Sequence, residues 1–236
     1  MSSRHEWGTA PDFVGPRHRL RERLLLDLLL SADPGPRILN AGAGQGTFSE
    51  LLTKRGFDVT SADSSPVAVA VLRERLDAHA VDADVKALPF VDATFDAAVL
   101  GEVLEHIEDD VAALREIARV VKPGGAVALS VPANPDRFGP SDRWAGHVRR
   151  YTRGALLATC GAAGLEVERC VAWGFPLSAL YHRHVYERHL DRHGPSRPTR
   201  RQRPAMALLG ALLQVDRLFV GVERGALGFL LLARRP

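Results

Sequence analysis

The feature that most constrains the fold is a glycine-rich turn between a short apolar strand and a helix. The segment 38–52, ILNAGAGQGTFSELL, spaces its glycines as Gly42-x-Gly44-x-Gly46. Glycines at such a turn let the backbone bend tightly, so that a flat ligand can lie across the strand ends. Because the next residue is Thr47, the spacing differs from the GxGxxG of dinucleotide folds and disfavours a dehydrogenase.

Alternating strand and helix patterns on both sides of this turn predict an α/β fold. Strands are expected at 37–40, 57–62, 78–82, 95–100, 126–131, 165–171 and 227–233, with helices at 17–31, 47–55, 66–76, 109–121 and 153–163. The segment 126–131, AVALSV, is nearly all apolar, as strands covered on both faces tend to be. The pattern therefore predicts a doubly wound, mostly parallel sheet of seven strands.

The composition is that of an ordinary globular protein, with 46% hydrophobic and 25% charged residues. A formal net charge of +3 is too small to indicate nucleic-acid binding. Arginines gather in 183–203, a pattern more usual for a solvated surface than for a phosphate or membrane patch. Cys160 and Cys170 lack metal-ligand spacing, and no histidine cluster predicts a metal site. Without a signal core or a spanning segment, we expect a cytoplasmic protein.

A second signal is an aspartate at the end of the next predicted strand. Asp63 lies 17 residues after Gly46, where a carboxylate can accept hydrogen bonds from both ribose hydroxyls of an adenosine ligand. The run Asp63-Ser64-Ser65-Pro66 would also serve as a helix cap. The register of Asp63 with the glycine turn favours the ligand.

The run from 82 to 132, DADVKALPFVDATFDAAVLGEVLEHIEDDVAALREIARVVKPGGAVALSVP, resembles the class I S-adenosylmethionine-dependent methyltransferases related to ubiquinone and menaquinone methyltransferases. With the glycine turn, the resemblance covers roughly residues 36–132. It implies a Rossmann-like methyltransferase fold, with S-adenosyl-L-methionine as the cofactor. It also implies that Asp84 accepts from the adenine amino group, and that Gly101 and Glu102 line the methionine end.

The cofactor site implied by these motifs comprises Asn40, Ala41, Gly42, Gly44, Asp63, Ser64, Asp84, Val85, Gly101 and Glu102. Asn40 departs from the family, which usually has Asp or Glu at this position to help hold the ammonium group of the cofactor. An amide oxygen can still accept a hydrogen bond but brings no charge. We therefore expect either weaker cofactor binding or a compensating acid elsewhere.

Two histidines are candidates for a catalytic role. His106, in the motif LEH, is often present in the family near the methyl end of the cofactor, where it could take a proton; capping of the strand-end loop is its alternative role. The segment 142–152 resembles a GH-x-R-x-Y motif that borders the acceptor pocket in some of these enzymes. His147 could act there as a base, with Trp144, Arg149, Arg150 and Tyr151 as candidate substrate-binding residues. Equally, this segment could cap the next helix, with Tyr151 packed and the arginines solvated.

The chain is expected to form a single domain, 1–236. Its parts are an N-terminal arm and helix (1–35), a core (36–173), a helical insertion between the last two strands (174–224) and the last strand (225–236). Helices at 177–190 and 205–220 carry apolar residues at helical spacing, which must be buried against something. An acceptor pocket, a homodimer partner and a membrane surface are the three alternatives for that contact.

The function that follows is transfer of a methyl group to a small-molecule acceptor, favoured at oxygen, by in-line displacement. One alternative is a lipid or quinone-like acceptor at a membrane surface, because the apolar run 205–213 lies beside the arginines. A second is a cofactor-binding protein without catalysis, for which Asn40 is the one indication.

Overall fold

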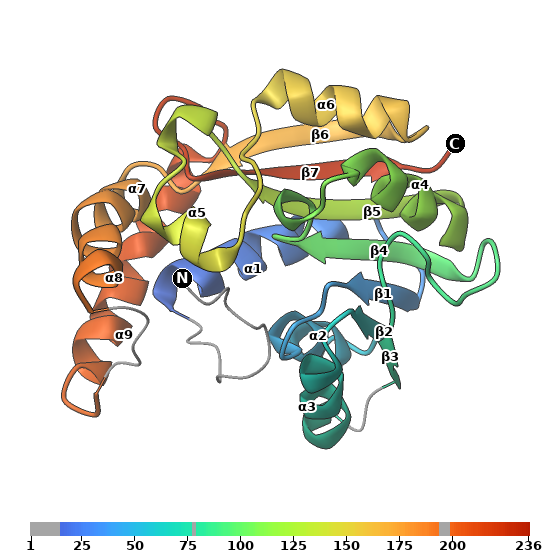
Figure 1. The fold of residues 1–236 in the computed structure, drawn as a ribbon, viewed down its shortest axis with the longest axis horizontal. Helices are drawn as coiled ribbons and strands as arrows, with labels where there is room; N and C mark the ends of the chain where they lie inside the picture. Colours follow the sequence, from blue (N-terminus) through green and yellow to red (C-terminus); the bar gives the residue numbers. More distant parts are fainter. Residues whose placement is uncertain (1–14, 77–78, 194–198) are drawn as a thin grey trace.

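The structure is a computed structural model that describes residues 15–76, 79–193 and 199–236. A seven-stranded sheet of order β3-β2-β1-β4-β5-β7-β6 crosses its centre (Figure 1). The strands are β1 Arg37–Ala41, β2 Asp58–Asp63, β3 His79–Asp82, β4 Phe95–Gly101, β5 Val121–Pro132, β6 Glu166–Trp173 and β7 Gly228–Arg234. β7 is antiparallel to both of its neighbours, and the other pairs are parallel. The predicted doubly wound, mostly parallel sheet is confirmed.

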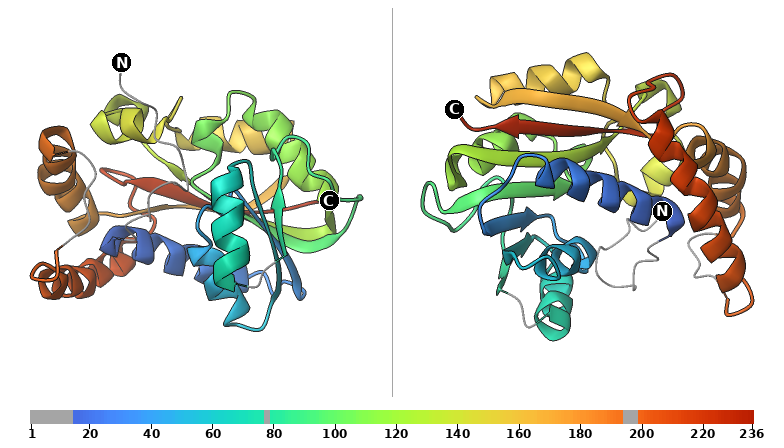
Figure 2. Two further views of the ribbon diagram at one scale, coloured as in Figure 1. Left: turned by 60° about the horizontal axis from the view of Figure 1, so that its bottom comes forward. Right: turned by 180° about the vertical axis from the view of Figure 1, so that it is seen from behind.

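Helices cover both faces of the sheet (Figure 2). The helices before the insertion are α1 Pro16–Leu30, α2 Thr47–Thr53, α3 Pro66–Leu76, α4 Asp110–Val120, α5 Pro140–Ala145 and α6 Arg153–Ala162, with 3-10 turns η1 Leu104–His106 and η2 Pro135–Arg137. On one face, α4 and α6 bury apolar side chains such as Leu114 and Leu156. On the other face, α1 and α2 do the same with Leu25 and Leu52. The two layers make the sheet a buried scaffold that fixes where its strand ends lie.

Local sequence explains the helix starts that position the later loops. The Asp109 side chain accepts from Ala112 N at 2.9 Å and caps α4. Thr152 caps α6 in the same way, by accepting from Ala155 N at 3.1 Å. A short polar side chain at this position satisfies one of the free N–H groups of the first turn.

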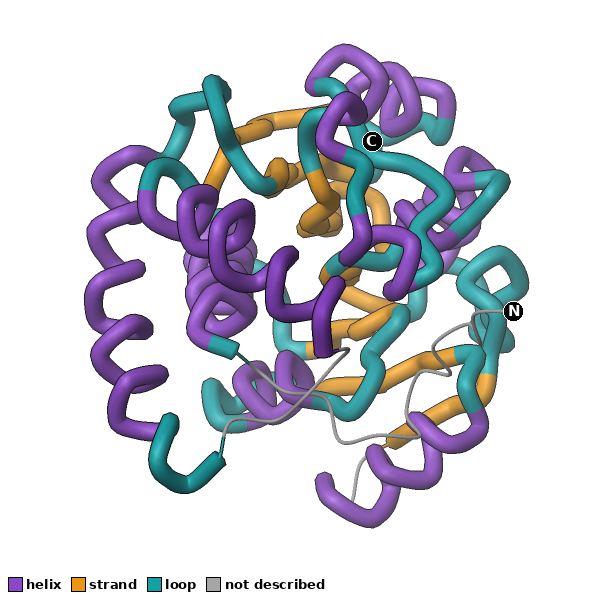
Figure 3. Tube along the Cα trace, turned by 60° about the vertical axis from the view of Figure 1, so that its left-hand side comes forward, coloured by secondary structure: helices purple, strands orange, loops and turns teal. Residues whose placement is uncertain are grey.

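Further helices occupy the segment between β6 and β7: α7 Leu177–Tyr181, the π-helical turn η3 His182–Tyr186, α8 Glu187–His193, α9 Arg203–Leu212 and the 3-10 helix η4 Leu213–Phe219. They lie beyond the carboxyl ends of the parallel strands, on the left of Figure 1 and toward the viewer in Figure 3. α8 packs against α5, and α9 against α1. Within the described part of the chain, every helix is too short or too polar to cross a membrane. Most of the N-terminal arm, residues 1–14, is outside the described residues.

Candidate active site

The glycine turn lies at the carboxyl end of β1, between the ends of β2 and β4. This is the switch point of the sheet, where open α/β folds bind their ligands. Gly42 has φ +69° and Gly46 has φ +81°, a region that favours glycine. A Cβ on Gly42 would meet Val103 Cγ2 at 2.5 Å, so only glycine lets the turn pack there. The chain therefore keeps bare backbone at the edge of the site.

Asp63 ends β2 directly beside this turn. Its Oδ2 accepts from Gly44 N at 2.8 Å, and its Oδ1 accepts from Ser65 N at 2.9 Å. Each carboxylate oxygen has a further lone pair for a ligand hydroxyl. The two backbone N–H groups thus fix the orientation of the carboxylate beside the glycine turn, and its contact with a ribose stays a prediction.

Asn40 is buried beneath the turn, 3% exposed. Its Nδ2 donates to Ser49 Oγ at 2.8 Å, and the Ser49 hydroxyl shares a second 2.8 Å hydrogen bond with Ser61 Oγ. An aspartate at this position has no N–H to donate. The Ser49 hydroxyl would then have to donate to the aspartate instead of accepting from the amide. The amide therefore belongs to a polar chain that links β1, α2 and β2.

Asp84 lies in the loop after β3 and is exposed, with Val85 buried next to it. The Asp84 Oδ1 accepts from Lys86 N at 2.9 Å, which leaves Oδ2 directed to solvent near Lys86 Nζ at 3.5 Å. The remaining predicted cofactor residues Ala41, Ser64 and Gly101 all lie at or after the carboxyl ends of β1, β2 and β4. The structure brings the predicted cofactor set together along one edge of the sheet.

Glu102 follows β4 with φ +61°, an uncommon conformation for a side-chain-bearing residue and often a mark of function. Its Oε2 lies 3.4 Å from Arg21 Nη1, whereas its Oε1 is buried without a hydrogen-bond partner among the described residues. Burial raises its pKa, but the charges of Arg21, His147 and Arg17 lower it more, so the pKa is below its ordinary value. Glu102 is therefore a charged carboxylate with an unused acceptor oxygen.

Arg17 and Arg21 were not expected at the site. Both come from α1, and the Arg17 guanidinium also lies over the Tyr186 ring at 5.0 Å from its centroid. The sequence offers no signal for this, because charged residues on an N-terminal amphipathic helix normally face solvent. Their position makes α1 one wall of the site.

Glu105 is also unexpected: it is fully buried on η1, and neither of its carboxyl oxygens is hydrogen-bonded to a described residue. Burial, and then the nearby charge of Glu102, raise its pKa well above 4.5. The two acids therefore differ in direction: the lowered pKa of Glu102 favours its charged form, and the raised pKa of Glu105 favours its neutral carboxylic acid. The motif LEH gave no indication of this, because it does not show which side of the turn faces the core.

The two candidate histidines are neighbours. The rings of His106 and His147 meet edge to face, with centroids 4.7 Å apart. Burial, and then His147, lower the pKa of His106 to about 4, so His106 is a neutral imidazole at neutral pH. His147 Nδ1 lies 2.8 Å from Asp142 Oδ1, which favours the tautomer with its proton on Nδ1 and a lone pair on Nε2. His106 can thus accept a proton, and His147 is oriented by Asp142 with its Nε2 3.8 Å from Glu105 Oε1.

Glu105, His106 and His147 are also the side chains that could hold a metal ion, since one donor atom from each lies within 4.8 Å of the others. The raised pKa of Glu105 works against this, because a neutral carboxyl is a poor ligand. We call Glu105, His106 and His147 the proton-transfer cluster, a role that stays a prediction.

The four predicted acceptor residues have different surroundings. Arg150 makes two hydrogen bonds to Asp142, at 2.8 and 2.7 Å, and Arg149 Nη1 donates to Asp110 Oδ2 at 2.9 Å. Tyr151 is 2% exposed and donates to the same Asp110 oxygen at 2.7 Å. Trp144, on α5, is half-buried. The contacts of both arginines and of Tyr151 favour the structural alternative, and substrate contact for any of the four stays a prediction.

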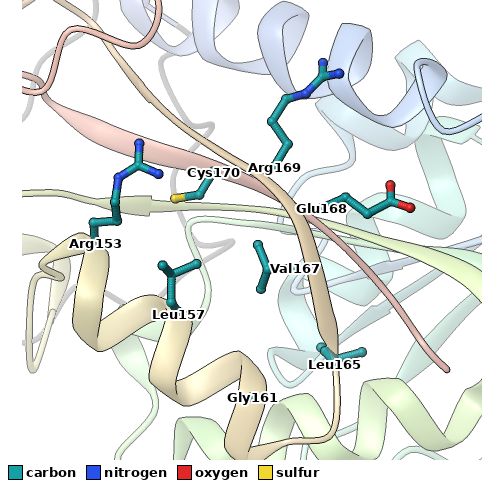
Figure 4. Close-up of a pocket in the computed structure, with 8 residues that line it drawn as sticks. All are labelled: Arg153, Leu157, Gly161, Leu165, Val167, Glu168, Arg169 and Cys170. Carbon is teal, nitrogen blue, oxygen red and sulfur yellow. The ribbon is translucent and has the colours of Figure 1, made fainter.

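A depression of about 490 Å³ lies elsewhere, between α6 and the edge strand β6 (Figure 4). Its lining includes Arg153, Leu157 and Cys170. Cys170 and Cys160 are free, buried thiols, and burial raises the pKa of both. This hollow is remote from the ends of β1, β2 and β4, so we do not assign it to the candidate site.

Comparison with known proteins shows which proteins the chain is similar to. Residues 39–129 match the family model described as a methyltransferase domain. The chain is 38% identical over 128 residues to a demethylmenaquinone methyltransferase from Renibacterium salmoninarum, covering 54% of this chain and 53% of that protein. It is 34% identical over 134 residues to a ubiquinone biosynthesis O-methyltransferase from Xanthomonas campestris pv. campestris, covering 53% and 56%. The chain spans about half the length of these curated relatives.

Among solved structures, the geranyl diphosphate C-methyltransferase from Streptomyces coelicolor A3(2) has a TM-score of 0.67 to this chain. The match covers 93% of this chain and 79% of that one at 16% identity, which shows a shared fold. That structure contains Mg²⁺, geranyl diphosphate and S-adenosyl-L-homocysteine.

Proposed function

We propose that this chain, which carries a class I S-adenosylmethionine-dependent methyltransferase domain, methylates a small organic acceptor at an oxygen atom. The domain is distantly similar to menaquinone and ubiquinone methyltransferases. The observation that carries the choice of oxygen is the imidazole pair His106 and His147 at the end of β4. A hydroxyl acceptor gains from a base close to the transferred methyl group, whereas a neutral amine does not.

The described residues fit the cofactor. The fixed Asp63 carboxylate would accept from the ribose hydroxyls, and Asp84 from the adenine amino group. The buried, unpaired Glu102 Oε1 fits the ammonium of the methionine end, where it would supply the negative charge that Asn40 lacks. Arg21, beside Glu102, fits a carboxylate in the same place. When bound, the cofactor supplies a methyl group on a positively charged sulfur.

The chain's own residues then place and deprotonate the acceptor. The acceptor hydroxyl would lose its proton to His106 or His147 as its oxygen takes the methyl group, and the cofactor would leave as a neutral thioether. Asp142 holds the His147 ring and stabilises the cation that forms if His147 takes the proton. Most of the acceleration would come from in-line positioning of the acceptor beside His106 and His147.

The test is cofactor turnover by the purified chain with acceptors that share one carbon skeleton and differ only in carrying a hydroxyl or an amine. We expect formation of S-adenosylhomocysteine with the hydroxyl series. His106→Gln and His147→Gln should each lower kcat with little change in the KM for the cofactor, and the larger loss identifies the base. His79→Gln, on exposed β3, is the matched control. Faster turnover of the amine series, or full activity in both histidine variants, would exclude base-assisted O-methylation.

A further inference from the structure

Helices α9 and η4 form an apolar arm at the edge of the molecule. One side of α9 contacts α1, where a Cβ on Gly210 would lie 3.6 Å from Pro16 Cβ. Leu209 and Leu213 pack into the core cluster on the α1 face of the sheet. Figure 2 shows the arm continuing past the sheet, with α1 as its neighbour. The other side of the arm has no covering element among the described residues.

That uncovered side is a stripe of large aliphatic residues. Leu208 is 63% exposed, Leu212 51%, Val215 43% and Leu218 83%. They recur every three or four residues and so share one helix face. Scattered exposed leucines are ordinary on a protein surface, whereas a continuous stripe of this kind marks an interaction site. We call these four residues the apolar stripe.

The charged side chains at the start of the apolar stripe have one sign, and farther along Arg217 pairs with Asp27 of α1 at 2.7 Å. Arg200, Arg201 and Arg203 are all exposed at the start of α9. The sequence from 199 to 215 contains no Asp or Glu. The next acid, Asp216, is buried and accepts from two backbone N–H groups of α7. The surface therefore combines apolar side chains with three arginines that have no acid within their own segment.

We propose that the apolar stripe and these arginines dock the protein on an anionic lipid bilayer. An interfacial helix places its apolar side chains at the boundary between head groups and acyl chains, and its arginines among lipid phosphates. A second copy of the chain fits less well, because it would bring three further arginines and no carboxylate from 199–215 to pair with them. The bilayer provides both the apolar phase and the negative charge.

Docking in this way would bring the candidate site close to the bilayer. The arm contacts α1, and α1 also carries the Arg17 and Arg21 side chains that lie near Glu102. The insertion as a whole lies beyond the carboxyl ends of the parallel strands (Figure 3). An acceptor could then reach the site from the lipid phase, although the docking surface itself does not depend on methyl transfer.

The experiment is vesicle co-sedimentation of the full chain without cofactor. Vesicles of phosphatidylcholine alone are compared with vesicles that also contain phosphatidylglycerol, at low and high salt. We expect binding to the mixed vesicles that weakens with salt. Leu208→Gln with Leu212→Gln should weaken it about tenfold or more. A triple Arg→Gln change at 200, 201 and 203 should remove the dependence on phosphatidylglycerol.

Val91→Gln is the matched control, because Val91 is 78% exposed on a loop outside the insertion and should not affect binding. Unchanged affinity for S-adenosylmethionine shows that each variant is folded. Absence of vesicle binding by the wild type, or equal binding by the double leucine variant, would overturn the proposal. A dimer mass that Leu208→Gln with Leu212→Gln reduces, without vesicle binding, would also overturn it and assign the apolar stripe to a second copy.

Discussion

The raised pKa of Glu105 has a measurable consequence for stability. Its pKa in the folded chain is well above the ordinary 4.5, because the side chain is buried beside charged Glu102. Above pH 4.5 the unfolded chain releases this proton while the folded chain keeps it, so the folded state binds more protons. Stability therefore falls as pH rises until the pH reaches the folded pKa. One such proton changes the free energy of unfolding by at most about 1.4 kcal/mol per pH unit.

Glu105→Gln removes the titrating proton and keeps the shape of the side chain. Urea unfolding of both proteins between pH 5 and pH 7 should show the wild type losing up to about 3 kcal/mol relative to the variant. The quantity compared is the change in the free energy of unfolding between the two pH values. Any cost of placing an amide in this site is the same at both and cancels. Glu166→Gln, at an exposed position on β6, controls for loss of a carboxylate in general.

Parallel stability curves for wild type and Glu105→Gln would refute the reasoning. They would show that Glu105 is ionised in the folded chain and has a positively charged partner. A metal ion held by Glu105, His106 and His147 would then be the first explanation to examine, by dialysis against a chelator and metal analysis.

Three further outcomes are expected. Asp63→Ala should weaken S-adenosylmethionine binding by roughly 1–3 kcal/mol, whereas Asn40→Asp should bind at least as tightly as wild type; equal calorimetric affinities for Asp63→Ala and wild type would contradict the ribose assignment. Tyr151→Phe should lower the free energy of unfolding by about 1–3 kcal/mol, because Asp110 loses a buried donor, and a change in acceptor KM alone would instead place Tyr151 in the pocket. Replacing 177–220 with a short linker should abolish turnover and leave cofactor binding largely intact, and turnover at the normal rate would show that the insertion is not a pocket wall.

The sheet could be predicted because its signals are local and repeated. Each of these signals depends on only a few consecutive residues. They are the glycine spacing after 37–40, the acid after the next strand and the apolar run 126–131. The helix α5 at Pro140–Ala145 was missed because six residues are too few to show a helical period. The turn η1 at Leu104–His106 was missed for the same reason. These two short elements carry or border most of the proton-transfer cluster, so the sequence indicated the cofactor edge better than the acceptor edge.

Burial explains why the charges of the site could not be foreseen. Glu102 and Glu105 are both glutamates in the turn after the same strand, and nothing in the sequence around them distinguishes their charges. In the fold, Glu102 Oε2 lies 3.4 Å from Arg21 Nη1, whereas Glu105 Oε1 lies 3.8 Å from His147 Nε2 and neither Glu105 oxygen has a hydrogen-bond partner among the described residues. A difference of this kind depends on the rotation of the strand-end turn against α1, which lies about eighty positions earlier in the chain. Local sequence patterns do not contain that rotation.

In the segment after β5, the Asp142 carboxylate contacts both Arg150 and His147, and these contacts distinguish a structural role from a catalytic one. Asp142 accepts from Arg150 through both of its oxygens and also lies against His147 Nδ1. These contacts hold the pKa of Asp142 at about 2, so it stays charged throughout the physiological range. The Arg150 side chain is 5% exposed and paired with Asp142, so its guanidinium has little capacity to bind an acceptor. Asp142 holds His147 at Nδ1, and His147 Nε2 lies 3.8 Å from Glu105 Oε1. The same carboxylate that makes Arg150 structural therefore orients His147, the candidate base.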